Sequence, residues 1–104
     1  MNTVLVYITA ENSAEALRIG RVLVEEKLAA CANVLDGMTS VYRWQGEICE
    51  DTESVLIAKT TEALAGALTE RVQVLHNYDC PCVVTLPISS GNTAFLDWIV
   101  EQTA

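Results

Sequence analysis

Apolar and polar residues alternate through the middle of the chain, on both sides of a short turn. The two alternating segments lie between Leu28 and Thr60 and flank Gln45-Gly46, a dipeptide suited to a tight hairpin turn. They predict one β-hairpin with arms of about 12 to 14 residues, where an average strand has about 5 or 6. Asp36-Gly37 predicts a bulge or bend in the first arm. A hairpin this long outgrows the core that 104 residues can build beneath it, so we expect copies of the same chain to cover its far end.

A strand and a helix are predicted before the hairpin. Residues 3–9 are apolar on both faces, which predicts a central strand. Asn12 and Glu15 have the spacing of a capping box for a helix that runs to about Leu28. A glycine within the apolar stripe of this helix predicts a close approach to the sheet. We expect the buried face to consist of Leu17, Gly20, Val24 and Leu28, with Ala16 and Leu23 alongside.

Three more elements are predicted after the hairpin. A second helix is expected from about Thr61 to Leu75, a strand from Cys82 to Ile88, and a last helix from Asn92 or Thr93. The order βαββαβ followed by a helix predicts the α+β class, with a ferredoxin-like antiparallel sheet and both crossover helices on one face. We expect residues 1–104 to form a single domain.

Composition limits the partners that the chain can have. Fourteen acidic against six basic residues give a net charge of −8, which argues against binding to nucleic acid or to an anionic membrane surface. The same charge either keeps a self-associating protein soluble or attracts cations. The chain has 51% hydrophobic residues and a mean hydropathy of +0.28, so we expect part of the apolar surface to lie at a subunit interface.

The sequence predicts a cytoplasmic location. No apolar run approaches the roughly 18 to 20 residues of a membrane span. The first basic residue is Arg18, which does not fit the cationic start of a signal peptide. The four cysteines are therefore expected to be reduced. Cys31 and Cys49 lie singly in strand patterns, where a free cysteine is usually a small buried apolar residue.

No catalytic set is visible, and we expect no enzyme activity. The one histidine, His76, has no serine in a nucleophile-elbow motif to act with. The loop after the first strand, residues 9–13, lacks the glycines of a phosphate-binding loop and the Cys-x-x-Cys of a metallochaperone.

One segment offers metal ligands. His76, Cys80 and Cys82 place an imidazole and two thiols between the second helix and the following strand, and such ligands suit Cu(I) or Zn. The alternative is structural: a histidine favoured by the helix C-terminus and two thiols that pack in the core.

Three further residues are candidates for a ligand cleft. Trp44, near the hairpin tip, is either an interface anchor or a lid on a cleft. Lys59 and Tyr78 lie near strand and helix ends and can hold a small anion together. The alternative for these two is a solvated lysine and a loop tyrosine.

The chain resembles the CutA family, the divalent-ion tolerance proteins, over nearly its whole length. The residues that carry the resemblance are Thr9-Ala10, 26–33, 42–48, 53–60, His76, Tyr78, Pro81, 86–88 and Gly91-Asn92 to Ile99. The resemblance implies a cytosolic homotrimer of ferredoxin-like subunits, similar to PII signalling proteins, with the Val41–Ile57 hairpins forming sheets between subunits. It also implies a link to copper and other divalent ions. The alternative function is a signalling scaffold in which a small anion binds between subunits near Lys59 and Tyr78, in the manner of PII proteins.

The chain departs from the family pattern at the segment with the candidate metal ligands. The family usually has His-Pro-Tyr-Glu followed by a residue, Pro and Glu, where this chain has Asn77, Asp79, Cys80 and Cys82. Some members carry a cysteine late in the first strand and a pair of histidines at the end of the second helix, proposed as copper ligands. The matching positions here are Ile8 and Leu75, which leaves His76 as the one ligand of that set.

Overall fold

Four antiparallel strands form one sheet, and the long hairpin is its largest part. A computed structural model of the protein describes residues 1–104, with the strand order β2-β3-β1-β4. Strand β1 therefore has a neighbour on each side, as its two apolar faces predicted. The strands are β1 (Thr3–Ala10), β2 (Cys31–Trp44), β3 (Glu47–Thr61) and β4 (Val83–Pro87).

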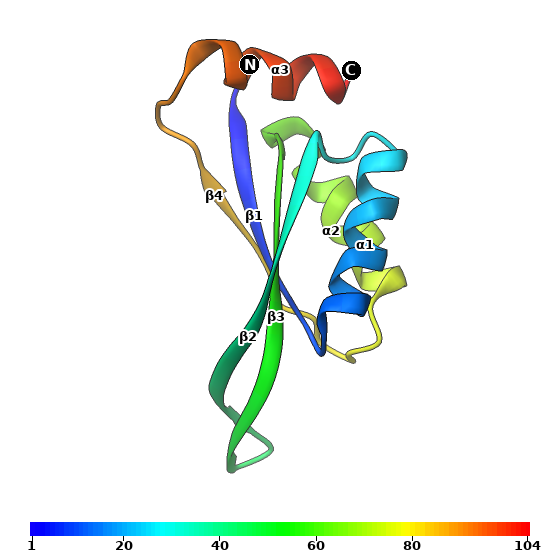
Figure 1. Ribbon diagram of the computed structural model, residues 1–104, viewed down its shortest axis with the longest axis vertical. Coiled ribbons are helices and arrows are strands. Elements are labelled where there is room, and N and C mark those ends of the chain that lie inside the picture. The colour runs from blue at the N-terminus through cyan, green and yellow to red at the C-terminus, as the bar shows by residue number, and fades with distance from the viewer.

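The order of strands and helices confirms the predicted α+β class, a ferredoxin-like βαββαβ arrangement followed by a C-terminal helix. They are α1 (Ser13–Glu25), α2 (Ala65–Leu75) and α3 (Thr93–Gln102). Figure 1 shows α1 and α2 on the same side of the sheet and α3 across the end that is opposite the hairpin tip. The second helix does not begin at Thr61 as predicted, because β3 continues to that residue and a 3₁₀ turn, Glu62–Leu64, precedes α2. None of these helices has the length and apolar character needed to span a membrane.

Backbone geometry explains the hairpin. Gln45 and Gly46 both have positive φ, 50° and 82°, as a turn of type I′ between two twisted strands requires. The arms have 14 and 15 residues. The register shifts between Leu35 and Met38, and Gly37 between them has φ of 75°. The predicted bulge in the first arm is therefore confirmed.

Helix α1 buries a different stripe from the one predicted. Asn12 Oδ1 accepts a hydrogen bond from the Glu15 N–H at 2.8 Å, so the predicted cap is present. Leu17 and Val24 were wrongly expected in the core, since their exposed fractions are 52% and 39%. The sequence contains two apolar stripes that share Gly20, and packing selects the one that points at the sheet. The buried residues of the helix are Ala16, Ile19, Gly20 and Leu23.

Leu28 was expected at the end of α1 but lies beyond it. The helix ends at Glu25, and the chain reverses at Lys27, whose φ is 60°. Leu28 then packs half-buried against the core from this turn. The core itself lies between the sheet and the two helices, with Val4, Val6 and Ile8 of β1 at its centre.

The opposite face of the sheet has no helical layer toward the hairpin. Strand residues alternate between faces, so Leu5 and Tyr7 of β1 point away from the core. On the neighbouring strands this face carries the exposed apolar side chains of Leu35, Val84 and Leu86. The hairpin extends past α1 and α2, as Figure 1 shows, and the molecule measures 44 × 25 × 22 Å. We call this surface the open face.

Two glycines provide a matched test of the close packing between α1 and the sheet. A Cβ at Gly20 would lie 3.0 Å from Leu56 Cδ1 and 3.2 Å from Ala32 Cβ, whereas one at Gly66 in α2 would meet nothing within 4 Å. Gly66→Ala is expected to raise the free energy of unfolding by about 0.5–1 kcal/mol through helix propensity. Gly20→Ala is expected to lower it by about 1–3 kcal/mol through overpacking. Urea unfolding at one protein concentration measures both, and equal stabilisation by the two substitutions would contradict the packing described.

Candidate cation cleft

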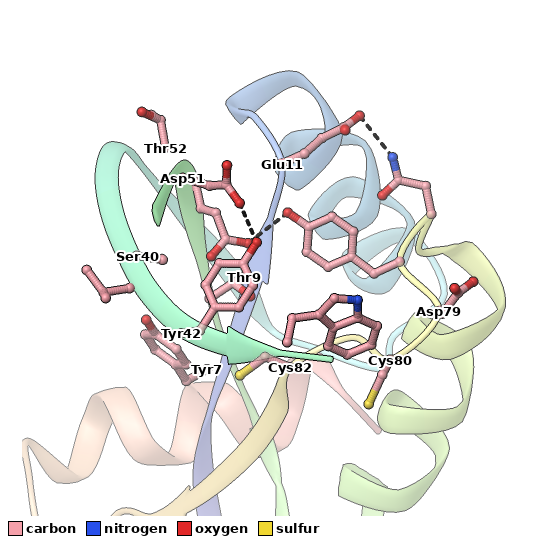
Figure 2. A pocket seen from close by; sticks show the side chains of 15 residues that line it. Tyr7, Thr9, Glu11, Ser40, Tyr42, Asp51, Thr52, Asp79, Cys80 and Cys82 are labelled. Carbon is pink, nitrogen blue, oxygen red and sulfur yellow. Dashed lines mark hydrogen bonds between the residues drawn. The ribbon is translucent and has the colours of Figure 1, made fainter. Parts of the chain in front are cut away.

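One cleft of about 850 Å³ lies where the open face meets the loop between α2 and β4. Tyr7 and Thr9 of β1 form its floor, since they alternate with the core residues of that strand. Both hairpin arms and residues 77–82 of the loop complete the walls. Figure 2 shows the carboxylates of Glu11, Asp51 and Asp79 at this cleft, together with the thiols of Cys80 and Cys82.

Carboxylates and aromatic rings dominate the lining. Four acidic side chains contribute to it, and no Lys, Arg or His does. The acidic residues are Glu11, Asp51, Glu53 and Asp79, and the aromatic residues are Tyr7, Tyr42, Trp44 and Tyr78. This composition attracts positive charge.

Two tyrosines are tied to two of these carboxylates. The hydroxyl of Tyr42 donates to Asp51, as Figure 2 shows, and that of Tyr78 donates to Glu53 Oε2 at 2.7 Å. The hydrogen bond to Asp51 raises the pKa of Tyr42 to about 12. Burial, followed by the hydrogen bond to Glu53, raises the pKa of Tyr78 well above its ordinary value. Both phenols are therefore protonated donors at neutral pH.

His76 holds the loop that carries Tyr78. Its imidazole is buried, with Nε2 2.7 Å from the carbonyl oxygen of Thr9. Nδ1 accepts the Tyr78 N–H at 3.1 Å, so the hydrogen is on Nε2, which donates to Thr9. The two rings are also in contact, with centroids 4.5 Å apart. His76 thus positions Tyr78 at the cleft.

The predicted metal ligands are close in sequence but do not form a ligand cluster. No group of three His, Cys, Asp or Glu side chains has the arrangement needed to hold a metal ion. Both nitrogens of His76 are engaged with protein atoms. Burial raises the pKa of the Cys82 thiol, which disfavours the thiolate that a metal binds. In this arrangement the three side chains do not converge on one metal position, although Cys80 and Cys82 both border the cleft.

The three candidate cleft residues separate into two groups. Trp44 and Tyr78 line the cleft, and Lys59 does not. Lys59 Nζ donates to Asn33 Oδ1 at 2.6 Å and lies 3.8 Å from Cys31 Sγ. Cys31 and Cys49, expected to be buried, are half-buried, because the strand register places both side chains on the open face. An anion held jointly by Lys59 and Tyr78 has no support in this arrangement.

Comparison with known proteins supports the resemblance seen in the sequence. A family model described as "CutA1 divalent ion tolerance protein" matches residues 4–102. This chain belongs to that family. The divalent-cation tolerance protein CutA of Thermus thermophilus is 50% identical over 99 residues, which cover 95% of this chain and 96% of that protein.

Two further relatives show how widely the CutA family is distributed. Protein CutA 1, chloroplastic, of Oryza sativa is 44% identical over 97% of this chain, which spans only 57% of that longer protein. A solved structure described as the periplasmic divalent cation tolerance protein CutA from Archaeoglobus fulgidus is 38% identical. It has a TM-score of 0.95 and covers 98% of this chain and 99% of its own.

The acidic character of the cleft was missed in the sequence of this CutA protein. Asp51 and Glu53 are two residues apart in a predicted strand, so they share a face. That spacing was the available signal. In the sequence, Glu11 belongs to a loop that is acidic and lacks glycine, and Asn77 is a departure from the family pattern. In the structure, Asn77 Nδ2 donates to Glu11 Oε1 at 2.9 Å. Their convergence depends on the fold, because they lie 66 residues apart.

Proposed function

We propose that this protein acts in divalent-cation tolerance as a non-enzymatic homotrimer that responds to metal ions, copper among them. The observation that carries the trimer is the uncovered apolar surface on the open face and the hairpin. The relatives named above for divalent-cation tolerance support the metal response.

The apolar side chains on the open face favour self-association. Val84 and Leu86 of β4 are 50% and 48% exposed, and Leu35 of β2, on the same face, is 59% exposed. Full burial of such a side chain contributes about 1.5–3 kcal/mol. Three copies related by a three-fold rotation would cover these residues in a closed ring, with no interface left unpaired. Pairing between hairpins of different copies would also cover the edge of β2.

The cleft composition favours a cationic over an anionic ligand. The alternative function, a PII-like scaffold that binds a small anion between subunits, needs a basic group at the cleft, and Lys59 is hydrogen-bonded elsewhere. A cytoplasmic location stays a prediction, since the rice relative is named as chloroplastic and the Archaeoglobus structure is described as periplasmic.

Light scattering tests the trimer. A homotrimer has three times the 11.3 kDa of the chain, and we expect that mass at micromolar concentration. Val84→Glu is expected to lower the measured mass to that of one chain, because a trimer of this variant would bury three carboxylates at the interface without partners.

Val74→Glu is the matched control. Val74 is 75% exposed on α2, away from the open face, so its substitution should leave the mass unchanged. A wild-type mass of one chain, or equal effects of the two substitutions, would refute assembly through the open face. Circular dichroism of both variants separates dissociation from unfolding.

Equilibrium dialysis under reducing, anaerobic conditions tests metal binding. A Cu(I) or Zn site formed by His76, Cys80 and Cys82 requires His76 to exchange a hydrogen bond for the metal. Cys80→Ser/Cys82→Ser is then expected to weaken soft-metal binding at least about tenfold, since thiolates are the preferred ligands. Cys49→Ser, which alters a half-buried thiol outside the cleft, should leave it unchanged. Equal affinity of the double variant and the wild type would end this part of the proposal.

A further inference from the structure

Glu53 is a buried carboxylate without a positive partner. Its exposed fraction is 9%, and ionised side chains are almost never buried this far unless they are paired. Its Oε2 accepts the Tyr78 hydroxyl, while Oε1 accepts no hydrogen bond from the protein and is not closed off from the cleft. The two ion pairs of the chain, Glu15–Arg18 and Glu26–Arg71, lie elsewhere. Because Glu53 lines the cleft, a cation in the cleft can supply the missing countercharge.

The surroundings of Glu53 favour a cation with an organic body. Aromatic faces attract cations, and Trp is the most effective of them. Trp44 and Tyr42 enter the cleft from β2, and Tyr78 enters from the facing loop. These rings also provide apolar surface, which a bare metal ion cannot use but a carbon chain can.

The size of the cleft and the positions of its carboxylates also favour an organic cation over a metal ion. A volume of about 850 Å³ lies in the range of small-molecule sites and is far larger than one metal ion needs. The carboxylates are distributed along the cleft and do not converge on one point, since no three of them could hold a metal ion.

We propose that the cleft binds a small aliphatic ammonium ion, with the Glu53 carboxylate as its counter-ion and the rings of Trp44, Tyr42 and Tyr78 as its walls. The ammonium group donates to Glu53 Oε1, and the hydrocarbon part lies against the aromatic side chains. This ligand class goes beyond divalent-cation tolerance.

Isothermal titration calorimetry with n-butylammonium chloride tests the proposal. Wild type should bind butylammonium, while n-butanol and butyrate, which match its chain but lack the positive charge, should not bind. Glu53→Gln keeps an acceptor for Tyr78 but removes the charge, and it should raise the Kd about tenfold or more, since a hydrogen bond to a charged group is lost. Glu47→Gln, an exposed carboxylate on the same strand outside the cleft, should leave the Kd unchanged.

A second variant keeps the test valid if Glu53→Gln folds poorly. Trp44 is about half exposed, so Trp44→Leu should fold normally and raise the Kd about two- to fivefold through loss of the cation–π contact. Absence of butylammonium binding to wild type would overturn the proposal. It would instead indicate that a basic side chain of a second copy supplies the positive charge for Glu53. Equal binding of butanol or butyrate, or a Kd unaffected by either variant, would also overturn it. Light scattering on the same samples reports the assembly separately, so failure of the trimer and failure of this site are distinguishable.

Discussion

Helices cover only one face of a sheet whose hairpin extends beyond them, and the other features of the protein depend on this asymmetry. The two crossover helices close the core over Val6, Ile8 and Leu56, and this core is all that one chain of this size can build. The hairpin arms of 14 and 15 residues continue past that core. Val41, Ile48, Val84 and Leu86 are therefore left exposed on an otherwise well-packed domain.

The bulge in β2 determines which side chains reach the cleft. Before it Leu35 pairs with Val55, and after it Met38 pairs with Glu53. The extra residue shifts the alternation by one position, so Tyr42 and Trp44 lie on the same face as Glu53 and Tyr7. The contact of the Tyr7 hydroxyl with Met38 Sδ at 3.5 Å fits this register. Without the bulge, Val41 and Arg43 would take that face, and the cleft would lose two of its aromatic rings.

The sequence predicted the elements well because their signals are local. The Gln45-Gly46 turn, the Asp36-Gly37 bulge and the Asn12 cap each depend on neighbouring residues, and each is present. The prediction of the buried face of α1 was wrong because two overlapping apolar stripes share Gly20. Only the contacts with Leu56 and Ala32 of the sheet distinguish them. A periodic pattern gives the faces of a helix but not the face that the sheet selects.

The cleft was harder to predict because it joins distant segments. Trp44 and Tyr78 were named as candidates and do line it. Lys59 was grouped with Tyr78 through its position near a strand end, yet its side chain lies toward Asn33. The burial of Glu53 without a countercharge depends on the three-dimensional arrangement alone, and no sequence pattern reports it.

Hydrogen exchange at the hairpin tests the central claim, that the part of the hairpin beyond the helices is covered by other copies. Strand β2 is an edge strand that pairs only with β3, so in an isolated chain every second amide of residues 39–44 points to solvent. In the proposed trimer, we predict that these amides exchange at least about a hundredfold more slowly than unprotected amides. Exchange at the unprotected rate, with β1 still protected, would contradict the account.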